Sequence, residues 1–260
     1  MADKNILVIG AHSYIAQNFE NYAKKKKKNW NVTLVSASDG AWEKADFSVY
    51  DTVLITAALV HRKKQKGTEA LYRKVNQELP VRITKRAKEA GIKQVIFLSS
   101  MSVFGDNVER ITKDTIPNPS SLYGKYKYKA EQVLEKFQSE EFRIAIVRPP
   151  MVYGEGCPGN YGRLKKLAKV TWIFPDTQNK RSMIAIEGLC RELGRIVENM
   201  ESGYFHPQDA EYINTAEMVQ KMRAEMGKKT YLTGGFNWIL KPLSKKVGIF
   251  RKVFGSMWYE

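Results

Sequence analysis

The apolar positions of the first 150 residues fall into five short runs, each separated from the next by helical or turn-rich sequence. Apolar runs of this length are typical of strands that are buried on both faces of a parallel sheet. The alternation of such strands with helices predicts an α/β fold, a Rossmann-type doubly wound parallel sheet. The expected strands cover residues 6–10, 32–36, 52–58, 94–100 and 143–149.

Two helices are expected within this first part. Residues 69–91 carry apolar side chains four positions apart and end in glycine, which predicts a helix. Pro80 should kink or divide that helix, because proline has no backbone N–H to donate. A second helix is expected over 128–137, with Pro119 and a pair of serines ahead of it as stop and cap.

After residue 149 the regular alternation weakens. We expect a basic helix over 163–169, a strand near 171–174 and a helix over 187–200. No linker rich in serine and glycine separates this part from the sheet, which argues against a second independent domain. The prediction is therefore a sheet domain over residues 1–150 and a smaller C-terminal lobe over residues 151–260.

The chain is strongly basic, with 43 Lys and Arg against 27 Asp and Glu and a formal net charge of +16. Its basic clusters, at 24–28, 61–66 and 125–129, are far apart and are typical of solvated helix ends and loops. A nucleic-acid binder remains an alternative, since lysine and arginine neutralise phosphates. A positive potential would equally attract a dinucleotide or a sugar nucleotide.

Cysteine usage and hydropathy set further bounds. Two isolated cysteines are too few for a disulfide framework or a tetrahedral metal site, so we expect no metal and a reducing compartment. The apolar run at 6–10 is too short for a signal peptide, and no window reaches the length of a membrane span. These features predict a cytoplasmic protein.

The first expected strand ends in "VIGAHSYIAQNF", where Gly10, Ser13 and Ala16 have the spacing of G-x-x-G-x-x-G. Small residues at these positions allow a tight turn, a close approach to a pyrophosphate and close packing of the next helix. The second strand ends at Ser36, and Asp39 follows three residues later. Because an acid at this strand end grips the ribose of NAD, the choice between NAD and NADP stays open, with NAD slightly favoured.

The stretch "SSLYGKYKYKAEQ" places Tyr123 four residues before Lys127, on one face of a helix. A free phenol has a pKa near 10, so it acts as a base near neutral pH only where positive charge favours the phenolate. Lys127 and an oxidised nicotinamide would lower that pKa by ~3 units, or about 4 kcal/mol. Ser99 and Ser100 end the fourth strand, where open sheets bind ligands, and a hydroxyl there can hold the reacting oxygen.

Seven stretches in order resemble the extended short-chain dehydrogenase/reductases: "VIGAHSYIA", "LITAALVH", "VN", "FLSSMSVFG", "YGKYKYKAE", "VRPPMVYGEG" and "NKRSMIAIEGL". Within them, residues 5–200 are most similar to the NAD-dependent epimerase/dehydratase group that modifies nucleotide sugars. The resemblance implies a nucleotide-sugar epimerase that uses NAD or NADP and acts at C4 of a UDP-sugar through a 4-keto intermediate, in polysaccharide precursor synthesis. An NADPH-dependent 4-keto-sugar-nucleotide reductase is the alternative.

The resemblance also implies roles for individual residues. Tyr123 would be the general acid/base, Lys127 would lower its pKa and bind the nicotinamide ribose, and Ser100 would bind the sugar hydroxyl. Cofactor contacts are expected from Gly10, Ser13, Tyr14, Ile15, Ser36, Ala57, Ala58, Asn76, Tyr123, Lys127, Pro149 and Pro150. Substrate contacts are expected from Ser100, Asn160, Arg163 and Arg181, with Arg181 on the nucleotide diphosphate.

Several positions depart from the family pattern without removing a catalytic group. The usual second and third glycines are Ser13 and Ala16, and Tyr126 stands where a serine is common. Met101 and Ser102 do not supply the Asp–Glu pair of a C4,C6-dehydratase, which disfavours that activity. A non-catalytic dinucleotide sensor is another alternative, but such proteins often lose the tyrosine or the lysine.

From Thr233 onward the chain mixes aromatic side chains with lysine and arginine. Apolar positions over 236–243 and 247–254 predict two amphipathic segments, and basic amphipathic segments can lie on anionic membranes. Two interpretations stay open for this tail. It associates weakly with a membrane surface, or its aromatics cover the substrate lobe or pair with a second subunit in a homodimer.

Overall fold

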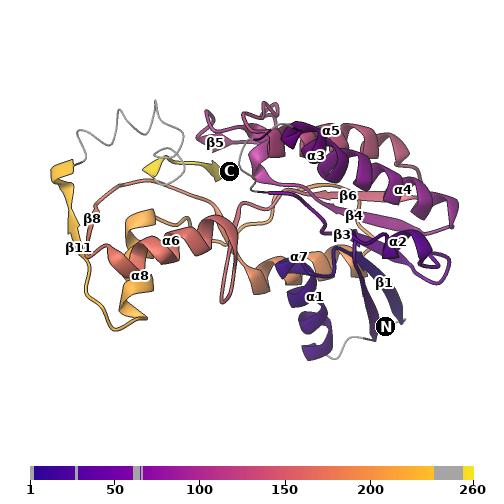
Figure 1. Cartoon of the computed structure of the whole chain (residues 1–260), viewed down its shortest axis with the longest axis horizontal. Coiled ribbons are helices and arrows are strands. Elements are labelled where there is room, and N and C mark those ends of the chain that lie inside the picture. Colours follow the sequence, from indigo (N-terminus) through magenta and orange to yellow (C-terminus); the bar gives the residue numbers. More distant parts are fainter. Residues whose placement is uncertain (1–2, 27–28, 61–64, 66, 237–253) are drawn as a thin grey trace.

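A six-stranded parallel sheet forms the centre of the protein, with the strand order β10-β6-β4-β3-β1-β2. The computed structural model describes residues 3–26, 29–60, 65, 67–236 and 254–260. The sheet confirms the predicted Rossmann-type α/β fold (Figure 1). Its strands are β1 (Lys4–Ile9), β2 (Trp30–Val35), β3 (Thr52–Ile55), β4 (Gln94–Leu98), β6 (Arg143–Val147) and β10 (Gly203–Phe205).

Helices cover both faces of this sheet. The helices are α1 (Tyr14–Lys25), α2 (Ala41–Lys44), α3 (Thr68–Arg73), α4 (Leu79–Glu89), α5 (Leu122–Leu134), α6 (Gly159–Val170), α7 (Ile186–Glu198) and α8 (Thr215–Ala224). Helices α1 and α7 pack on one face through Phe19 and Leu193, whereas α4 and α5 pack on the other through Ile83 and Leu134. Because both faces are covered, β3 and β4 are buried along their whole length.

The helix expected over 69–91 is divided, as Pro80 predicted. It consists of α3, a π-helical turn over Lys74–Glu78, and α4. Pro80 lies in the first turn of α4, directly after the π-helical turn, and the backbone stays helical through both. The turn that precedes the proline therefore marks the division.

The prediction of a helix over 128–137 was wrong at its start, because α5 begins at Leu122. The Ser121 hydroxyl accepts a hydrogen bond from the backbone N–H of Gly124 at 3.1 Å and caps the helix. The early start places Tyr123 in the first turn, and the four-residue spacing to Lys127 is therefore helical.

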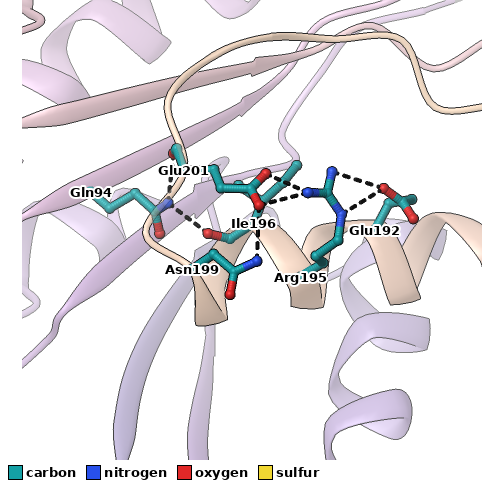
Figure 2. Close-up of polar contacts among 6 residues, drawn as sticks. All are labelled: Gln94, Glu192, Arg195, Ile196, Asn199 and Glu201. Atoms are coloured by element: carbon teal, nitrogen blue, oxygen red, sulfur yellow. Dashed lines mark hydrogen bonds and ion pairs between the residues drawn. The ribbon is translucent and has the colours of Figure 1, made fainter.

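A buried glutamine at the start of β4 ties the end of α7 to the sheet (Figure 2). The predicted site residues lie at the other end of this strand. The Gln94 amide nitrogen donates to the carbonyl oxygens of Ile196 and Glu201, each at 2.9 Å. Its amide oxygen accepts from the Thr52 hydroxyl at 3.0 Å. Arg195 pairs with the Glu201 carboxylate at 2.6 Å, so the turn after α7 is held from two sides.

We expect Gln94→Leu to lower the free energy of unfolding by about 2–4 kcal/mol, because two carbonyls and one hydroxyl lose a buried partner. Urea denaturation followed by far-ultraviolet circular dichroism measures the change. The matched control is Gln132→Leu, at an exposed position of α5. An unfolding midpoint of Gln94→Leu equal to that of the control would contradict this interpretation of the contact.

The smaller lobe has its own apolar cluster, which joins α6 and α8 through Leu164, Phe174 and Val219. However, α7 and β10, which follow α6 and β8 in the chain, belong to the central sheet and its covering helices. The spatial boundary therefore does not coincide with residue 150 of the chain. The remaining short strands pair as β5 (Arg110–Ile111) with β12 (Trp258–Tyr259), β7 (Met151–Tyr153) with β9 (Met183–Ala185), and β8 (Ile173–Pro175) with β11 (Tyr231–Thr233).

The described part of the tail, 254–260, contacts both lobes. Phe254 packs against Phe174 of the small lobe, with ring centroids 5.7 Å apart. Tyr259 packs edge-on against Phe104 beside the sheet. Most of the two predicted amphipathic segments, over 237–253, lies outside the described residues.

Candidate active site

The turn between β1 and α1 leaves room for glycine alone at position 10. Gly10 has φ +122°, and a Cβ there would lie 2.5 Å from the Thr56 hydroxyl and 2.7 Å from the Ala57 nitrogen. Ser13 caps α1, because its hydroxyl accepts from the Ala16 N–H at 3.0 Å and donates to Thr56 at 2.9 Å. The first turn of α1, which is fully described, has no acidic side chain. This helix N-terminus therefore suits a pyrophosphate.

The side chains of Tyr14 and Ile15 serve the fold. The Tyr14 hydroxyl donates to the carbonyl oxygen of Glu155 at 2.9 Å, and burial raises the pKa of this phenol to about 12. Ile15 packs against the apolar cluster beneath α1. Contacts from these two residues to a pyrophosphate would therefore come from backbone N–H groups of the first helical turn.

At the end of β2, an acidic side chain lies beside Ser36. The Asp39 carboxylate accepts a hydrogen bond from the backbone N–H of Ala41 at 2.9 Å. This bond and the nearby Ser36 side chain lower the pKa of Asp39. The fold of the loop thus brings Asp39 close to Ser36, although Asp39 lies three residues after the end of the strand. A 2′-phosphate near Ser36 would therefore meet negative charge.

Asn76 supports the loop that follows β3. It is fully buried in the π-helical turn, and its amide group both accepts from the Leu59 N–H and donates to the Leu59 carbonyl, each at 2.9 Å. Ala57 is buried and Ala58 is exposed immediately before this clamp. The contacts make Asn76 a support for the loop backbone, and π-turns of this kind are frequent at functional sites.

At the end of β4, the chain turns into a 3-10 helix over Met101–Phe104. The Ser100 hydroxyl caps that turn by accepting from the Ser102 N–H at 3.2 Å. A Cβ at Gly124 would overlap the Ser102 carbonyl, so the glycine lets α5 approach the turn closely. This approach brings Tyr123 next to Ser100.

The Tyr123 and Ser100 side chains both line the cavity, and the Ser100 hydroxyl is near enough to influence the phenol. Burial raises the pKa of Tyr123 to about 12, while the interaction with Ser100 lowers it by less. Without a nicotinamide, the phenol pKa thus lies above its usual value, and the lowering by ~3 units expected from Lys127 together with an oxidised nicotinamide stays a prediction. Removal from water outweighs the other influences on this phenol.

Lys127 is fully buried beneath the pair of hydroxyls. Its ammonium donates to the carbonyl oxygen of Leu98 at 2.7 Å and lies 4.4 Å from the centre of the Phe97 ring. Burial lowers the pKa of Lys127 to about 7, and the Glu131 charge opposes this shift. Lys127 therefore changes charge near neutral pH, and it contacts the β4 backbone and not the cavity wall.

Glu131 continues the helix face of Tyr123 and Lys127 by one more turn. It is fully buried and forms an ion pair with Arg148 at 2.7 Å, between Oε2 and Nη2. The same carboxylate accepts from the Ser99 hydroxyl. Sequence reasoning missed this network, although an acid four residues after Lys127 was a usable signal.

A cavity of about 930 Å³ opens between this strand edge and the small lobe. It brings six of the predicted site residues together. The others lie at the ends of β1, β2 and β3, at the start of α1, in the π-helical turn, or on α5 and after β6. Of these, the Pro149 carbonyl accepts from the Met101 N–H at 3.0 Å. The six are Ser100, Tyr123, Pro150, Asn160, Arg163 and Arg181.

Arg181 contributes a guanidinium group to the small-lobe side of the cavity. It donates to the carbonyl oxygen of Gly255 at 2.8 Å, and its backbone N–H donates to Ile213 at 3.1 Å. Burial lowers the pKa of Arg181, and the charge of Asp106 opposes that shift. The planar fork is thus held by backbone contacts at the cavity, a geometry suited to a diphosphate.

The cavity residues that were not anticipated include Tyr72, Ser102, Asp106 and Met257. Tyr72 lies in the segment interpreted as an ordinary covering helix, and its hydroxyl donates to the Val60 carbonyl at 2.9 Å. Met257 reaches the cavity because its backbone pairs with that of Arg181, just before β12. No local pattern indicates that long-range pairing, so the sequence held no signal for Met257.

The parallel sheet, the glycine turn before α1 and the cavity at the strand ends define a dinucleotide-binding protein of the Rossmann class. The chain belongs to the NAD dependent epimerase/dehydratase family, whose model matches residues 6–171. This confirms the family resemblance drawn from the seven sequence stretches.

Two relatives have described functions. The chain is 30% identical over 216 residues to a UDP-glucose 4-epimerase from Vibrio cholerae, a match that covers 78% of this chain and 63% of that protein. It is 27% identical over 246 residues to N-acetyl-alpha-D-glucosaminyl-diphospho-ditrans,octacis-undecaprenol 4-epimerase from Escherichia coli O157:H7, covering 86% of this chain and 73% of the relative. The chain thus spans less than two thirds of the Vibrio relative.

Solved structures show the same fold. A UDP-glucuronic acid 4-epimerase from Bacillus cereus in complex with NAD has a TM-score of 0.74 at 16% identity, covering 98% of this chain and 87% of that one. A dTDP-4-dehydrorhamnose reductase from Clostridium acetobutylicum has a TM-score of 0.74 at 21% identity, covering 88% and 82%. Among the helices that the structure describes, none is long and apolar enough to cross a membrane.

Proposed function

We propose that this protein is an NAD-dependent nucleotide-sugar epimerase that inverts C4 of a UDP-sugar through a 4-keto intermediate, in the synthesis of glycan precursors. The observation that carries the proposal is that the Ser100 and Tyr123 side chains line one cavity, which Arg163 and Arg181 also line. The two curated relatives, both 4-epimerases, support it.

The residues around the β1–α1 turn fit a dinucleotide, because Gly10 leaves no room for a side chain and the capped helix N-terminus carries no acid in its described first turn. Ser36 and Asp39 would hold its adenosine ribose, and the loop clamped by Asn76 would lie beneath it. When bound, a nicotinamide dinucleotide supplies the hydride acceptor and a positive charge that favours the phenolate.

The chemistry at the sugar falls to three side chains. Tyr123 takes the proton of the C4 hydroxyl as the hydride leaves C4, and it returns that proton when the ketone is reduced on its other face. Ser100 donates to the same oxygen and holds it in place. Lys127, one turn along α5, keeps positive charge near the tyrosine when it is protonated, which stabilises the phenolate.

The substrate side of the cavity suits an anionic nucleotide. Arg163 and Arg181 line the cavity with Asn160, on the small lobe. A diphosphate accepts two parallel hydrogen bonds from a guanidinium fork. The cavity volume of about 930 Å³ is within the ordinary range for ligand sites, roughly 300–1,000 Å³.

Mass spectrometry of nucleotides released from the purified protein tests the choice of epimerase. An epimerase regenerates its cofactor in each cycle, so we expect NAD to copurify, and Asp39 should exclude NADP. A protein that is empty as purified and turns over only with added NADPH would instead be a 4-keto-sugar-nucleotide reductase.

Arg181→Lys should raise the KM for the UDP-sugar by about tenfold or more, because lysine keeps the charge but loses the bidentate fork. Steady-state kinetics measures the effect, with Arg191→Lys on the exposed side of α7 as the matched control. An unchanged KM in Arg181→Lys would show that this arginine does not bind the diphosphate.

Three expectations about partners and location stay predictions: a cytoplasmic protein, a homodimer and no nucleic-acid ligand. Sedimentation velocity measures the oligomeric state. A nucleic-acid binder would bind oligonucleotides with a steep salt dependence and would be indifferent to Tyr123→Phe, whereas we expect neither property.

A further inference from the structure

Exposed apolar side chains gather on β8, on β11 and at the end of α6. Figure 1 shows β8 and β11 at the far end of the small lobe, away from the central sheet. In the described part of the chain, ten large apolar side chains are exposed, and five of them are here. Val170 is 76% exposed, Trp172 61% and Tyr231 60%. This concentration exceeds what scattered surface apolar residues produce. We call the five the Trp172 patch: Leu167, Val170, Trp172, Ile173 and Tyr231.

The backbone holds the patch in shape. Tyr231 pairs with Ile173 in the parallel ladder of β8 and β11, and its N–H donates to the Trp172 carbonyl at 2.9 Å. The rings of Trp172 and Tyr231 meet edge to face, with centroids 6.2 Å apart. Two aromatic side chains are thus presented together by ordered strands.

The two chain segments that carry the patch are basic. Residues 159–175 and 226–236 hold six lysines and arginines and no aspartate or glutamate, although Asp176 and Glu225 stand just outside. Lys228 donates to the carbonyl oxygen of Lys169 at 3.3 Å, which brings the basic groups of the two segments together. The six are Arg163, Lys165, Lys166, Lys169, Lys228 and Lys229.

We propose that the Trp172 patch docks on the surface of a membrane that carries anionic lipid headgroups. Tryptophan and tyrosine favour the interface of a bilayer, where aliphatic neighbours such as Val170 and Ile173 can bury in the acyl region. The lysines complement the headgroup charge. Asn160 and Arg163 lie at the start of α6 and Leu167 and Val170 at its end, so one helix links the cavity to this surface.

Two other occupants fit the patch less well. A second copy of the chain would bring the same lysines face to face across a two-fold axis, and these like charges repel. A nucleic acid would use the aromatic rings for stacking but would leave Val170 and Ile173 in water. The combination of aliphatic, aromatic and basic side chains matches a lipid surface best.

Flotation of the full chain with vesicles tests the proposal, using phosphatidylcholine alone and phosphatidylcholine mixed with phosphatidylglycerol. We expect binding to the mixed vesicles and little to the neutral ones. Lys166→Gln with Lys169→Gln should weaken binding by roughly fivefold per lysine. Trp172→Ala with Tyr231→Ala should weaken it by about tenfold or more. The matched controls are Ile116→Ala, at an apolar side chain 80% exposed, and Lys93→Gln, at an exposed lysine; both should bind like the parent.

Thermal melting of each variant confirms folding without reference to activity, so the test is independent of the proposed function. Three results would overturn the proposal. The first is a parent protein that stays in solution with both vesicles. The second is a pair of patch variants that float as well as the parent, which would place the contact elsewhere on the chain. The third is patch variants that lose oligonucleotide binding or self-association while vesicle binding is absent.

Discussion

Replacing Tyr123 by phenylalanine should lower turnover of a UDP-sugar by roughly 10²–10⁴-fold, the range for loss of a general acid/base. In the proposed mechanism the phenol oxygen, which lies at the cavity with Ser100, accepts the proton, and phenylalanine keeps the ring without that oxygen. Cofactor binding should stay close to that of the parent, because the β1–α1 turn is untouched. Turnover is measured by product analysis, and cofactor binding by calorimetry.

Tyr128→Phe provides the matched control on the same helix. Its side chain packs against the apolar cluster of Met101 and Phe104, and it does not line the cavity. We expect turnover within a few-fold of the parent. If Tyr123→Phe and Tyr128→Phe turned over alike, the assignment of Tyr123 as acid/base would be wrong.

Glu131→Gln should lower the free energy of unfolding by about 3–5 kcal/mol, because it leaves the buried Arg148 without its counter-ion. The pair joins α5 to the end of β6 at 2.7 Å, and both side chains are almost fully removed from water. Chemical denaturation measures the loss. Glu131→Asp, which keeps the charge, should recover part of it.

A pH profile separates the electrostatic effect of Glu131 on Lys127 from a simple loss of stability. The Glu131 charge raises the pKa of Lys127, which burial holds at about 7. In Glu131→Gln that pKa falls further, so Lys127 loses its proton at lower pH. If activity needs protonated Lys127, the alkaline limb of kcat/KM should move to lower pH. The control, Glu135→Gln at an exposed position one turn along, should move neither stability nor the profile.

The sheet could be predicted because its strands are apolar on both faces. The apolar runs near Ile6, Val53 and Ile96 had no other stable environment than the interior of a parallel sheet. The start of α5 was missed because Tyr123 and Gly124 are poor indicators of a helix, and the cap at Ser121 decided it instead. A capping serine is a weak signal in a sequence, although in the structure it determines where the helix begins.

Site residues at the ends of strands could be predicted from the sequence. Site residues that reach the cavity through pairing between segments far apart in the chain could not. Ser100 and Tyr123 come together because a strand end and a helix start face each other across Gly124. Burial depends on everything packed around a group, so the desolvation that raises the pKa of Tyr123 could not be predicted from local sequence. The Met257 contact needed a pairing between residues far apart in the chain.

Hydride removal from C4 and its return is the central claim, and an isotope experiment tests it most directly. The protein is incubated with UDP-glucose deuterated at C4, and the product is examined by nuclear magnetic resonance and mass spectrometry. We predict the C4 epimer with the deuterium still on C4, since the hydride returns to the carbon it left. Absence of a C4 epimer, or an epimer whose C4 label has been exchanged for solvent hydrogen, would contradict the proposed function.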